Sequence, residues 1–381
     1  MVSLYKFKQY LRLSKKLSSI LRHGVVPLSL RFLRKKLSFM IDYRFRGGYS
    51  SPPFSLHVGV TDFCNLRCKM CFYANTLSPY SRLNNLGMMD LNLFKKLIRE
   101  IKGKPAVILT GGEPLLHPEI EYFVEEVKKN GMISIMATNG TLLKQKARKL
   151  VDAGLDYLMV SVDGTKKIHD GVRGFKGTFR KAVDGIKEIN KCKNRPVITV
   201  NFSVSDFNYL NMKEFVEEVK KWGIDIINFN MLWQRTPKMI KAHNKLYPQF
   251  KVSSLNYQYN NKKIDFKKFE EDILWIRSRK SDKVVNFYPL LSYGDIVTYY
   301  TIPEKFLKAH LAKCPWINFH ISPNGDVVLC GDIIFGNLNK DNVNDIWNNN
   351  KFRLFRNKIK KSKAFPICAR CCGFFELEAL S

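Results

Sequence analysis

The sequence predicts an α/β protein in which helices wrap a parallel sheet, with a basic helical arm before it and a small cysteine-rich domain after it. Between residues 55 and 235, apolar runs typical of buried strands alternate with stretches whose apolar residues recur at helical spacing. Strands that alternate with helices indicate βαβ units and hence a parallel sheet. Beyond residue 313 the alternation stops, and five cysteines and a hairpin pattern follow.

Six strands and six helices account for most of the expected alternation. The strands are expected at 56–61, 106–110, 132–137, 157–162, 197–204 and 224–232. The helices are expected at 90–102, 118–130, 144–153, 178–191, 209–222 and 265–276. Several helices end just before a glycine, such as Gly103 or Gly131, where a left-handed cap is favourable. In parallel barrels the functional groups gather at the C-terminal ends of the strands.

The stretch from 236 to 313 is expected to complete the sheet and to link it to the last domain. A short strand is expected at 284–289. Residues 238–263 are polar and rich in Asn, Lys and Tyr, which predicts a surface excursion or lid.

The first fifty residues are expected to form a basic amphipathic arm of two helices. They contain twelve Lys and Arg against one acid, in a chain of 381 residues whose formal net charge is +31. Apolar residues recur at helical spacing on either side of Pro27, which separates the helices. Such a helix is typical of an element that lies on an anionic membrane surface.

Other interpretations of the arm stay open. A packing element with a solvated basic face is the second interpretation; nucleic-acid binding is the third, although no nucleic-acid-binding fold is recognisable. The arm lacks the uninterrupted apolar core of a signal peptide, and no apolar run approaches the roughly eighteen residues that span a bilayer. Nine cysteines without a secretory signal favour metal binding in the reducing cytoplasm over disulfides.

Three cysteines, Cys64, Cys68 and Cys71, stand in the phrase VTDFCNLRCKMCFY directly after the first expected strand. A C-x2-C pair alone is typical of a zinc knuckle or a redox dithiol. The third cysteine departs from the zinc pattern, and no second pair follows nearby. Three thiolates leave one iron of a four-iron cluster without a protein ligand, whereas such clusters normally have four cysteines. A structural metal site remains the alternative.

The phrase GGEP, Gly111 to Pro114, follows the second expected strand. Together with the cysteine triplet, it resembles the radical S-adenosylmethionine (SAM) superfamily. The six βα units are similar to the partial (β/α)6 barrel of that superfamily. The resemblance implies a 4Fe–4S cluster on Cys64, Cys68 and Cys71 whose open iron binds SAM. It further implies reductive cleavage of SAM to a 5′-deoxyadenosyl radical, which abstracts a hydrogen atom from the substrate.

The resemblance also assigns residues to SAM itself, at strand ends and in the loops that follow. It implies that Tyr73 lies beside adenine and that Asn139 faces ribose or substrate. Ser161 and Arg173 are implied to contact SAM, the arginine through the SAM carboxylate. The loop at the SAM amino group is implied to consist of Gly111, Gly112, Glu113 and Pro114. Simple packing (Tyr73), a turn (Asn139) and a surface ion pair (Arg173) are the alternatives.

A second group of cysteines follows residue 313. The stretch HISPNGDVVLC predicts a hairpin around Asn324-Gly325 that delivers Cys330 at a strand end. The region resembles the auxiliary-cluster domains called SPASM and Twitch, and its cysteine count fits the shorter Twitch-like arrangement. The implied ligands of a second 4Fe–4S cluster are Cys314, Cys330, Cys368 and Cys371, with Cys372 as a substitute for Cys371 and zinc as the alternative metal. Cys192 is expected to be a small core residue.

The expected domains are therefore 1–50 (arm), 51–235 (barrel core), 236–313 (barrel completion and linker) and 314–381 (auxiliary cluster). The leading interpretation is a radical SAM enzyme that oxidises or otherwise modifies a small or membrane-associated substrate, such as a sugar, polyol or lipid headgroup. A peptide-modifying maturase and a noncatalytic Fe–S or nucleic-acid-binding protein are the rivals. The first fifty residues are too short and too basic for the winged-helix leader-binding domain of many peptide-modifying relatives.

A one-electron reductant such as flavodoxin or ferredoxin is the implied partner. The expected location is the cytoplasm, with the inner face of the membrane as a docking surface.

Overall fold

One mostly parallel sheet organises the molecule. The structure, a computed structural model, describes residues 28–71, 87–253, 264–279, 284–307, 312–331 and 333–371, with side chains of the first segment from residue 37. Within these residues a ten-stranded sheet has the order β10-β9-β8-β1-β2-β3-β4-β5-β6-β7. The strands are β1 (Ser55–Thr61), β2 (Ala106–Gly111), β3 (Ser134–Thr138), β4 (Tyr157–Ser161), β5 (Val197–Val204), β6 (Ile226–Met231), β7 (Val284–Tyr288), β8 (Asn318–Ile321), β9 (Asp326–Leu329) and β10 (Ile333–Asn337).

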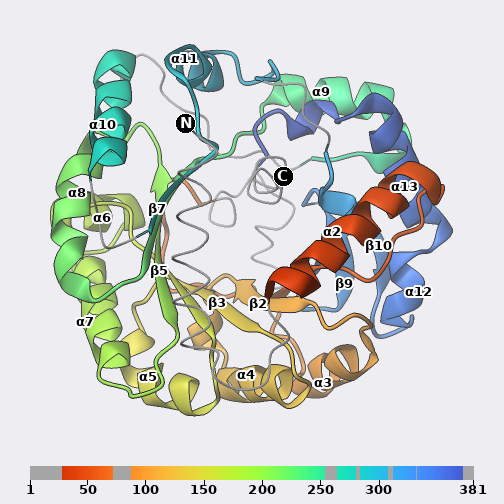
Figure 1. Cartoon of the computed structure of the whole chain (residues 1–381), viewed down its shortest axis with the longest axis horizontal. Helices are drawn as coiled ribbons and strands as arrows, with labels where there is room; N and C mark the ends of the chain where they lie inside the picture. Colours follow the sequence, from red (N-terminus) through yellow and green to blue (C-terminus); the bar gives the residue numbers. More distant parts are fainter. Residues whose placement is uncertain are drawn as a thin grey trace.

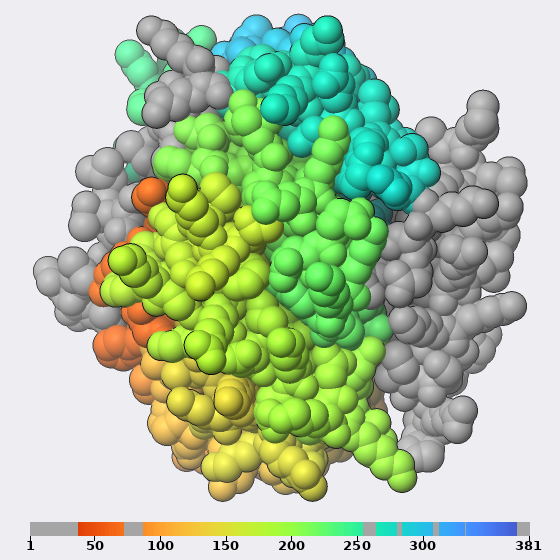
Figure 2. Space-filling model, turned by 90° about the vertical axis from the view of Figure 1, so that its left-hand side faces the viewer, coloured from red at the N-terminus to blue at the C-terminus, as the bar shows by residue number. Residues whose placement is uncertain are grey.

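Helices form an outer ring around the strands (Figure 1). All neighbours from β1 to β7 are parallel, so the six expected strands and the short seventh one are confirmed. The helices are α2 (Leu28–Phe45), α3 (Leu91–Glu100), α4 (Ile120–Lys129), α5 (Leu143–Asp152), α6 (Lys166–Arg173), α7 (Thr178–Asn190), α8 (Met212–Val219), α9 (Pro237–Leu246), α10 (Phe266–Ser278), α11 (Tyr293–Thr301), α12 (Val343–Trp347) and α13 (Asn350–Ser362). Figure 2 looks onto the side of the molecule that α7, α8 and α10 cover.

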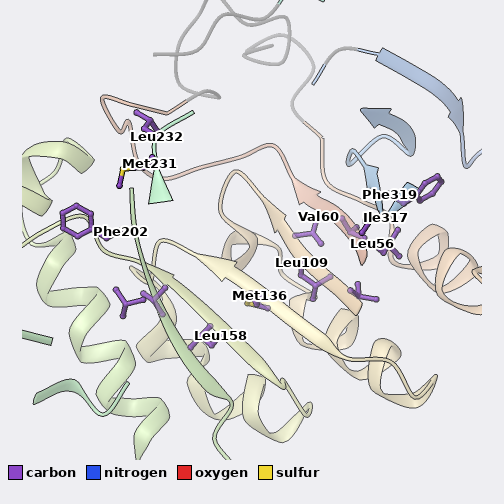
Figure 3. Packing of buried hydrophobic residues seen from close by; sticks show 14 of the residues in the cluster. Leu56, Val60, Leu109, Met136, Leu158, Phe202, Met231, Leu232, Ile317 and Phe319 are labelled. Atoms are coloured by element: carbon purple, nitrogen blue, oxygen red, sulfur yellow. The ribbon is translucent and has the colours of Figure 1, made fainter. Parts of the chain in front are cut away.

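Alternation along the strands sets the core between the sheet and its helices. Leu56, Val58 and Val60 of β1 are fully buried, while the residues between them are half-buried. The same pattern repeats in β2 and β4. Figure 3 shows these buried side chains, with Leu56 close to Phe319 of β8. The other side of the strands, which faces away from the helices, is therefore left for function.

The cysteine-rich region joins the same sheet. Its strand β8 pairs in parallel with β1, and the expected hairpin brings β9 back antiparallel around Gly325, whose φ is 86°. The barrel and the auxiliary region thus share a continuous hydrogen-bonded sheet, a connection that the sequence did not predict.

Residues 238–253, predicted as part of a polar surface excursion or lid, form a surface helix and a turn with a packed inner face. Helix α9 begins at Pro237, after Thr236 accepts the N–H of Met239, and its inner face buries Met239 and His243. The His243 ring contacts Phe365 at a centroid distance of 5.3 Å. The Lys and Asn content hides this packed face from a sequence pattern. Residues 254–263 lie outside the described part of the chain.

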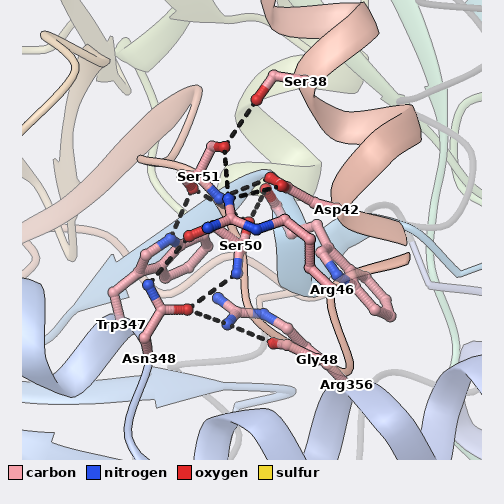
Figure 4. A network of polar contacts seen from close by, with 10 residues as sticks. Ser38, Asp42, Arg46, Gly48, Ser50, Ser51, Trp347, Asn348 and Arg356 are labelled. Carbon is pink, nitrogen blue, oxygen red and sulfur yellow. Dashed lines mark hydrogen bonds and ion pairs between the residues drawn. The ribbon is translucent and has the colours of Figure 1, made fainter. Parts of the chain in front are cut away.

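The predicted second helix of the arm is α2, and its C-terminal half is anchored. Asp42, 3% exposed, accepts hydrogen bonds from the Ser51 backbone N–H and from Arg46 (Figure 4). Arg356 of α13 donates to the carbonyl oxygen of Gly48, just beyond the helix. The first helix of the arm lies outside the described residues. In the portion of the chain that the structure covers, no helix is long and apolar enough to cross a membrane.

Candidate active site

The cysteine loop starts where β1 ends, at the C-terminal edge of the sheet. Backbone N–H groups of the GGEP loop hold it in place, since Gly112 donates to the oxygen of Thr61 (2.7 Å) and Glu113 to that of Phe63 (2.8 Å). Within the loop, the Arg67 guanidinium donates to the carbonyl oxygen of Cys64. The two motifs that the sequence singled out are therefore one structural unit.

The three thiols lie close enough to influence one another. Burial raises the pKa of the Cys68 thiol to about 11; the charge of Arg173 opposes this, while Cys71 and Cys64 raise it further. Burial also raises the pKa of Cys64. As thiolates these groups would repel one another unless a cationic centre stood among them. The residues present therefore fit an iron–sulfur cluster held by three thiolates.

The two glycines of GGEP allow the motifs to meet. Gly111 has a φ of 130°, and a Cβ there would lie 2.2 Å from the carbonyl oxygen of Thr61. A Cβ on Gly112 would lie 2.2 Å from that of Phe63. Any side chain would push the cysteine loop away from β2, so the glycines have a structural reason to be there besides the predicted approach to SAM.

Glu113 is a fully buried anchor. Its carboxylate accepts hydrogen bonds from the Thr138 hydroxyl (2.6 Å) and from the backbone N–H groups of Leu115 and Asn139. Burial raises its pKa, against the lowering effect of these donors. Glu113 thus ties the GGEP loop to the end of β3, and Pro114, also buried, opens the 3-10 turn that follows.

Asn139 also connects loops. Its amide donates to Oδ1 of Asn65 in the cysteine loop (2.9 Å), and its own oxygen accepts from the backbone and hydroxyl of Thr141. Asn65 donates in turn to Thr141. Asn139 is only 7% exposed. The predicted contact with ribose or substrate remains a prediction, beside a bracing role that the structure supplies.

Ser161 and Arg173 reach the site from β4 and α6. Ser161 ends β4 and is half-buried. The Arg173 guanidinium forms an ion pair with Asp163 (2.6 Å), and its Nη1 lies 3.7 Å from the Cys68 sulfur. Burial would lower the pKa of Arg173, but Asp163 and Cys68 raise it overall. Arg173 therefore lies at the cysteine loop in a buried ion pair rather than a surface one, and its contact with SAM remains a prediction.

Asp163 is a residue that the sequence reasoning missed. It is fully buried, and its other oxygen accepts the backbone N–H of Ser203. Burial raises its pKa, while Arg173 lowers it. An aspartate two residues after Ser161 at a strand end was the available signal. Because Asp163 holds one end of the guanidinium, it fixes how Arg173 meets its neighbours.

The auxiliary cysteines come from separate segments. Burial raises the pKa of the Cys368 thiol well above its ordinary value, and Cys330 and Cys371 raise it further. Cys330 follows β9 with a φ of 52°. Arg235, which follows β6 and was not predicted, is buried and donates to the carbonyl oxygen of Cys330 (2.9 Å).

Two further contacts position this second group. Cys314 opens a 3-10 turn, Cys314–Trp316, next to Ala312, whose N–H donates to the oxygen of Lys363 near the end of α13. Arg370, between Cys368 and Cys371, donates to the carbonyl oxygens of Thr298, Tyr299 and Ile302 at the C-terminal end of α11. The C-terminal cysteine loop is thereby fixed on the barrel.

Some predicted residues stay untested. Tyr73 and Cys372 lie outside the described residues. Across the part of the chain that is described, no three His, Cys, Asp or Glu side chains gather closely enough to hold one metal ion.

Comparison with known families decides the identity of the chain. The family model of the radical SAM superfamily matches residues 58–221, from β1 through α8. The chain belongs to the radical SAM superfamily. A second model, the iron–sulfur cluster-binding domain SPASM, matches residues 313–372.

Relatives and solved structures agree with this assignment. The tungsten-containing aldehyde ferredoxin oxidoreductase cofactor-modifying protein of Pyrococcus furiosus is 25% identical over 83% of this chain and 86% of its own length. The AdoMet-dependent heme synthase of Methanosarcina barkeri is 34% identical, over 43% of this chain and 46% of that protein. Streptococcus suis SuiB bound to SAM has a TM-score of 0.59 at 17% identity, over 92% of this chain and 78% of SuiB. The likeness to SuiB shows the fold alone.

These findings establish the broad activity. The chain is an enzyme of the radical SAM superfamily, with SAM and two 4Fe–4S clusters as its cofactors, and radical SAM enzymes need an external reductant. That Cys64, Cys68 and Cys71 hold the SAM-binding cluster, and the group around Cys368 the second, remains a prediction with which the neighbouring thiols are compatible.

Proposed function

We propose that this enzyme oxidises a small or membrane-associated substrate, such as a sugar, a polyol or a lipid headgroup. When bound, SAM on the reduced cluster supplies the abstraction of a hydrogen atom from an unactivated C–H bond. A second cluster, held by the group around Cys368, would supply an acceptor for the remaining electron, and we propose a two-electron oxidation as the outcome. The chain itself supplies Arg173 beside Cys68 to hold anionic groups next to the cluster loop.

The observation that carries the substrate class is the composition of three strands of the barrel. β5, β6 and β7 contain no charged residue, yet polar side chains such as Asn201 and Asn228 occupy their half-buried positions. Polar groups at half-buried positions are costly unless they hydrogen-bond. A lining of this kind suits a substrate that is polar but uncharged where it touches these strands.

Helix α2 supports the membrane part of the proposal. Leu37, Met40, Ile41 and Phe45 lie on one side of the helix and are between 46% and 77% exposed. The other side is anchored through Asp42, so the apolar side stays turned outward. Many cations accompany these residues in the arm, and apolar side chains flanked by Lys and Arg are typical of a helix that lies on an anionic surface. We therefore also propose a cytoplasmic enzyme that docks on a membrane.

A peptide substrate is the second candidate. SuiB has also been solved with its precursor peptide SuiA, with a TM-score of 0.61 over 92% of this chain, but at 15% identity that likeness concerns the fold. The Pyrococcus furiosus relative is named as cofactor-modifying, and its match extends over most of both chains. That relative favours a small molecule over a peptide.

An anaerobic assay tests the activity. Reconstituted enzyme, SAM and dithionite should yield 5′-deoxyadenosine, measured by mass spectrometry. A chain that carries its full iron content and makes none would be a noncatalytic Fe–S protein, contrary to the proposal.

Liposome sedimentation tests the docking. Removing residues before Gly47 would also remove Asp42 from its buried network, so point variants are sharper. Leu37→Ser with Phe45→Ser should weaken binding to anionic vesicles, while Leu246→Ser with Leu274→Ser, two exposed leucines on α9 and α10, should not. Binding should also fall as salt rises, since ions screen the attraction. If the full chain does not bind anionic vesicles at low salt, then α2 is a packing element only.

A further inference from the structure

Three asparagines form a hydrogen-bonded ladder across neighbouring strands. Asn201 of β5, Asn228 of β6 and Asn286 of β7 are direct partners in the sheet register. The Asn286 amide donates to Oδ1 of Asn228 (2.9 Å), and the Asn228 amide donates to Oδ1 of Asn201 (3.1 Å). The three side chains therefore stand in one row on one face of the sheet.

That face is the inner one. The residues next in sequence, Phe202, Phe229 and Phe287, form a parallel row on the other face, with centroids 5.2 and 5.0 Å apart. Phe202 and Phe229 also contact Phe215 of α8. Because successive side chains of a strand point to opposite faces, the asparagines point away from the helices and into the barrel.

The ladder continues toward the cluster. Ser161 of β4 is the register partner of Asn201, so the row ends on a residue that the radical SAM resemblance assigns to SAM. Two residues further along the strands, Ser203 pairs with Asn230. The Ser203 backbone donates to Asp163, the partner of Arg173, which lies against Cys68. A molecule held on this wall would thus lie next to the reacting end of the barrel.

The three amides have donors and acceptors that the ladder itself does not use. Its two internal bonds use one N–H each of Asn286 and Asn228, and one acceptor position each of Asn228 and Asn201. The Asn201 amide nitrogen and the Asn286 oxygen have no partner among the described residues. All three side chains are half-buried, so these groups open toward the interior of the barrel. Apolar residues would fill such positions at lower cost if packing alone mattered.

We propose that this amide ladder binds the uncharged, polyhydroxylated ring of the substrate, a sugar or cyclitol. The inference rests on the proposed function and names the recognition site for it. Each amide presents a donor and an acceptor side by side, which matches a hydroxyl group that both donates and accepts. The strands carry no charge that would favour an ionic ligand.

The spacing of the ladder favours a ring over a peptide. Amides on neighbouring strands repeat at about 4.8 Å, whereas groups on one face of an extended peptide repeat at about 6.8 Å. Hydroxyls on alternate carbons of a six-membered ring are separated by a distance close to that of the ladder. A peptide substrate is therefore an outcome that the test must be able to reveal.

The test measures binding directly and needs no turnover. Saturation-transfer NMR with the reconstituted enzyme and SAM would use methyl β-glucoside and myo-inositol as neutral probes, and N-acetyl-dialanine methylamide as the peptide probe. We expect the ring probes to bind and Asn228→Leu, which removes the central amide at similar volume, to weaken them about ten-fold, as for the loss of one to two hydrogen bonds. Asn344→Leu is the matched control, because Asn344 also makes amide hydrogen bonds, but to Glu100 and Lys102 on the outside of the barrel.

A second part of the experiment distinguishes a soluble sugar from a sugar that is the headgroup of a lipid. Phosphatidylcholine vesicles with monoglucosyldiacylglycerol should bind more tightly than the free glucoside if the ring is part of a lipid, and no more tightly if it is a soluble sugar. Equal binding of the ring probes by the wild type and Asn228→Leu, or preference for the peptide probe, would overturn the inference. It would leave the proposed SAM cleavage intact, which is measured separately as 5′-deoxyadenosine.

Discussion

The two cysteine groups of this enzyme are built in opposite ways. Cys64, Cys68 and Cys71 lie on one loop after β1, and the GGEP backbone holds that loop. The auxiliary cysteines come from the turn before β8, the end of β9 and the segment after α13. The first group has three thiols and a buried Arg173–Asp163 pair beside them. The second has four expected thiols, and Arg235 contacts its Cys330.

The difference teaches how cluster chemistry follows from the fold. If the three thiols of the loop bind a cluster, one iron stays open for SAM, and the protein needs only to shape its surroundings. Four thiols from distant segments would saturate a cluster and would also tie those segments together. The pairing of β1 with β8 joins the two groups into one sheet. Predictions about each group can therefore be tested against the other.

The largest effect should follow from emptying one group at a time. The wild type should hold about eight irons after anaerobic reconstitution, four for each cluster. Cys64→Ala with Cys68→Ala and Cys71→Ala should hold about four, since the auxiliary thiols remain. Iron analysis with EPR checks this. A triple variant that retains the full iron content would show that these cysteines are not cluster ligands.

The fourth auxiliary ligand is the next difference to test. We expect Cys371→Ser to reduce the iron content toward that of one cluster, whereas Cys372→Ser should leave it near the wild-type value. The structure places Cys371 beside Cys368, whose pKa it raises. The reverse pattern of iron loss would assign the ligand to Cys372.

A smaller effect should follow at Arg173. Loss of one charge-assisted contact costs about 1.5–3 kcal/mol, so Arg173→Ala should weaken SAM binding about ten- to hundred-fold, by calorimetry on reconstituted enzyme. It should also destabilise the fold, because Asp163 would stay buried without its partner. Arg173→Ala with Asp163→Asn should recover stability but not SAM affinity. Unchanged SAM affinity in both variants would make the pair purely structural.

The seam between the two regions should affect stability alone, as a pH dependence. His57 of β1 stacks on His320 of β8 at a centroid distance of 4.3 Å. Burial lowers the pKa of His320 to about 4 and also lowers that of His57. The unfolded chain, with histidine pKa values of about 6.5, binds protons that the folded chain does not.

Stability should therefore fall as the pH drops from about 6.5 toward 4, by at most about 1.4 kcal/mol per pH unit and histidine. His320→Phe, which stacks but does not titrate, should flatten this dependence in anaerobic thermal melts. An identical pH dependence in variant and wild type would place the titrating groups elsewhere.

The sequence predicted what local patterns encode. The strands of the barrel were clear from their apolar runs, and the cysteine triplet with GGEP was clear from its spacing. Helix α9 was missed because only Met239, Ile240 and His243 face inward among Lys and Asn residues. The signal for α9 was the Thr236 cap followed by Pro237.

Long-range partners could not be predicted in the same way. The pairing of Asp163 with Arg173 depends on how α6 packs beside β4. The ladder of Asn201, Asn228 and Asn286 depends on sheet register, which no single strand specifies. The contact of β8 with β1 depends on residues more than 250 positions apart. In each case the sequence shows the residues themselves, but it does not show which distant residue each one contacts in the fold.

The central claim is that the loop with Cys64, Cys68 and Cys71 carries SAM cleavage, and that the auxiliary group does not. The most direct measurement is anaerobic formation of 5′-deoxyadenosine from SAM and dithionite by three proteins of known iron content. The wild type and the Cys330→Ala with Cys368→Ala variant should form 5′-deoxyadenosine, and the Cys64→Ala, Cys68→Ala and Cys71→Ala variant should form none. Formation of 5′-deoxyadenosine by that triple variant would contradict the account.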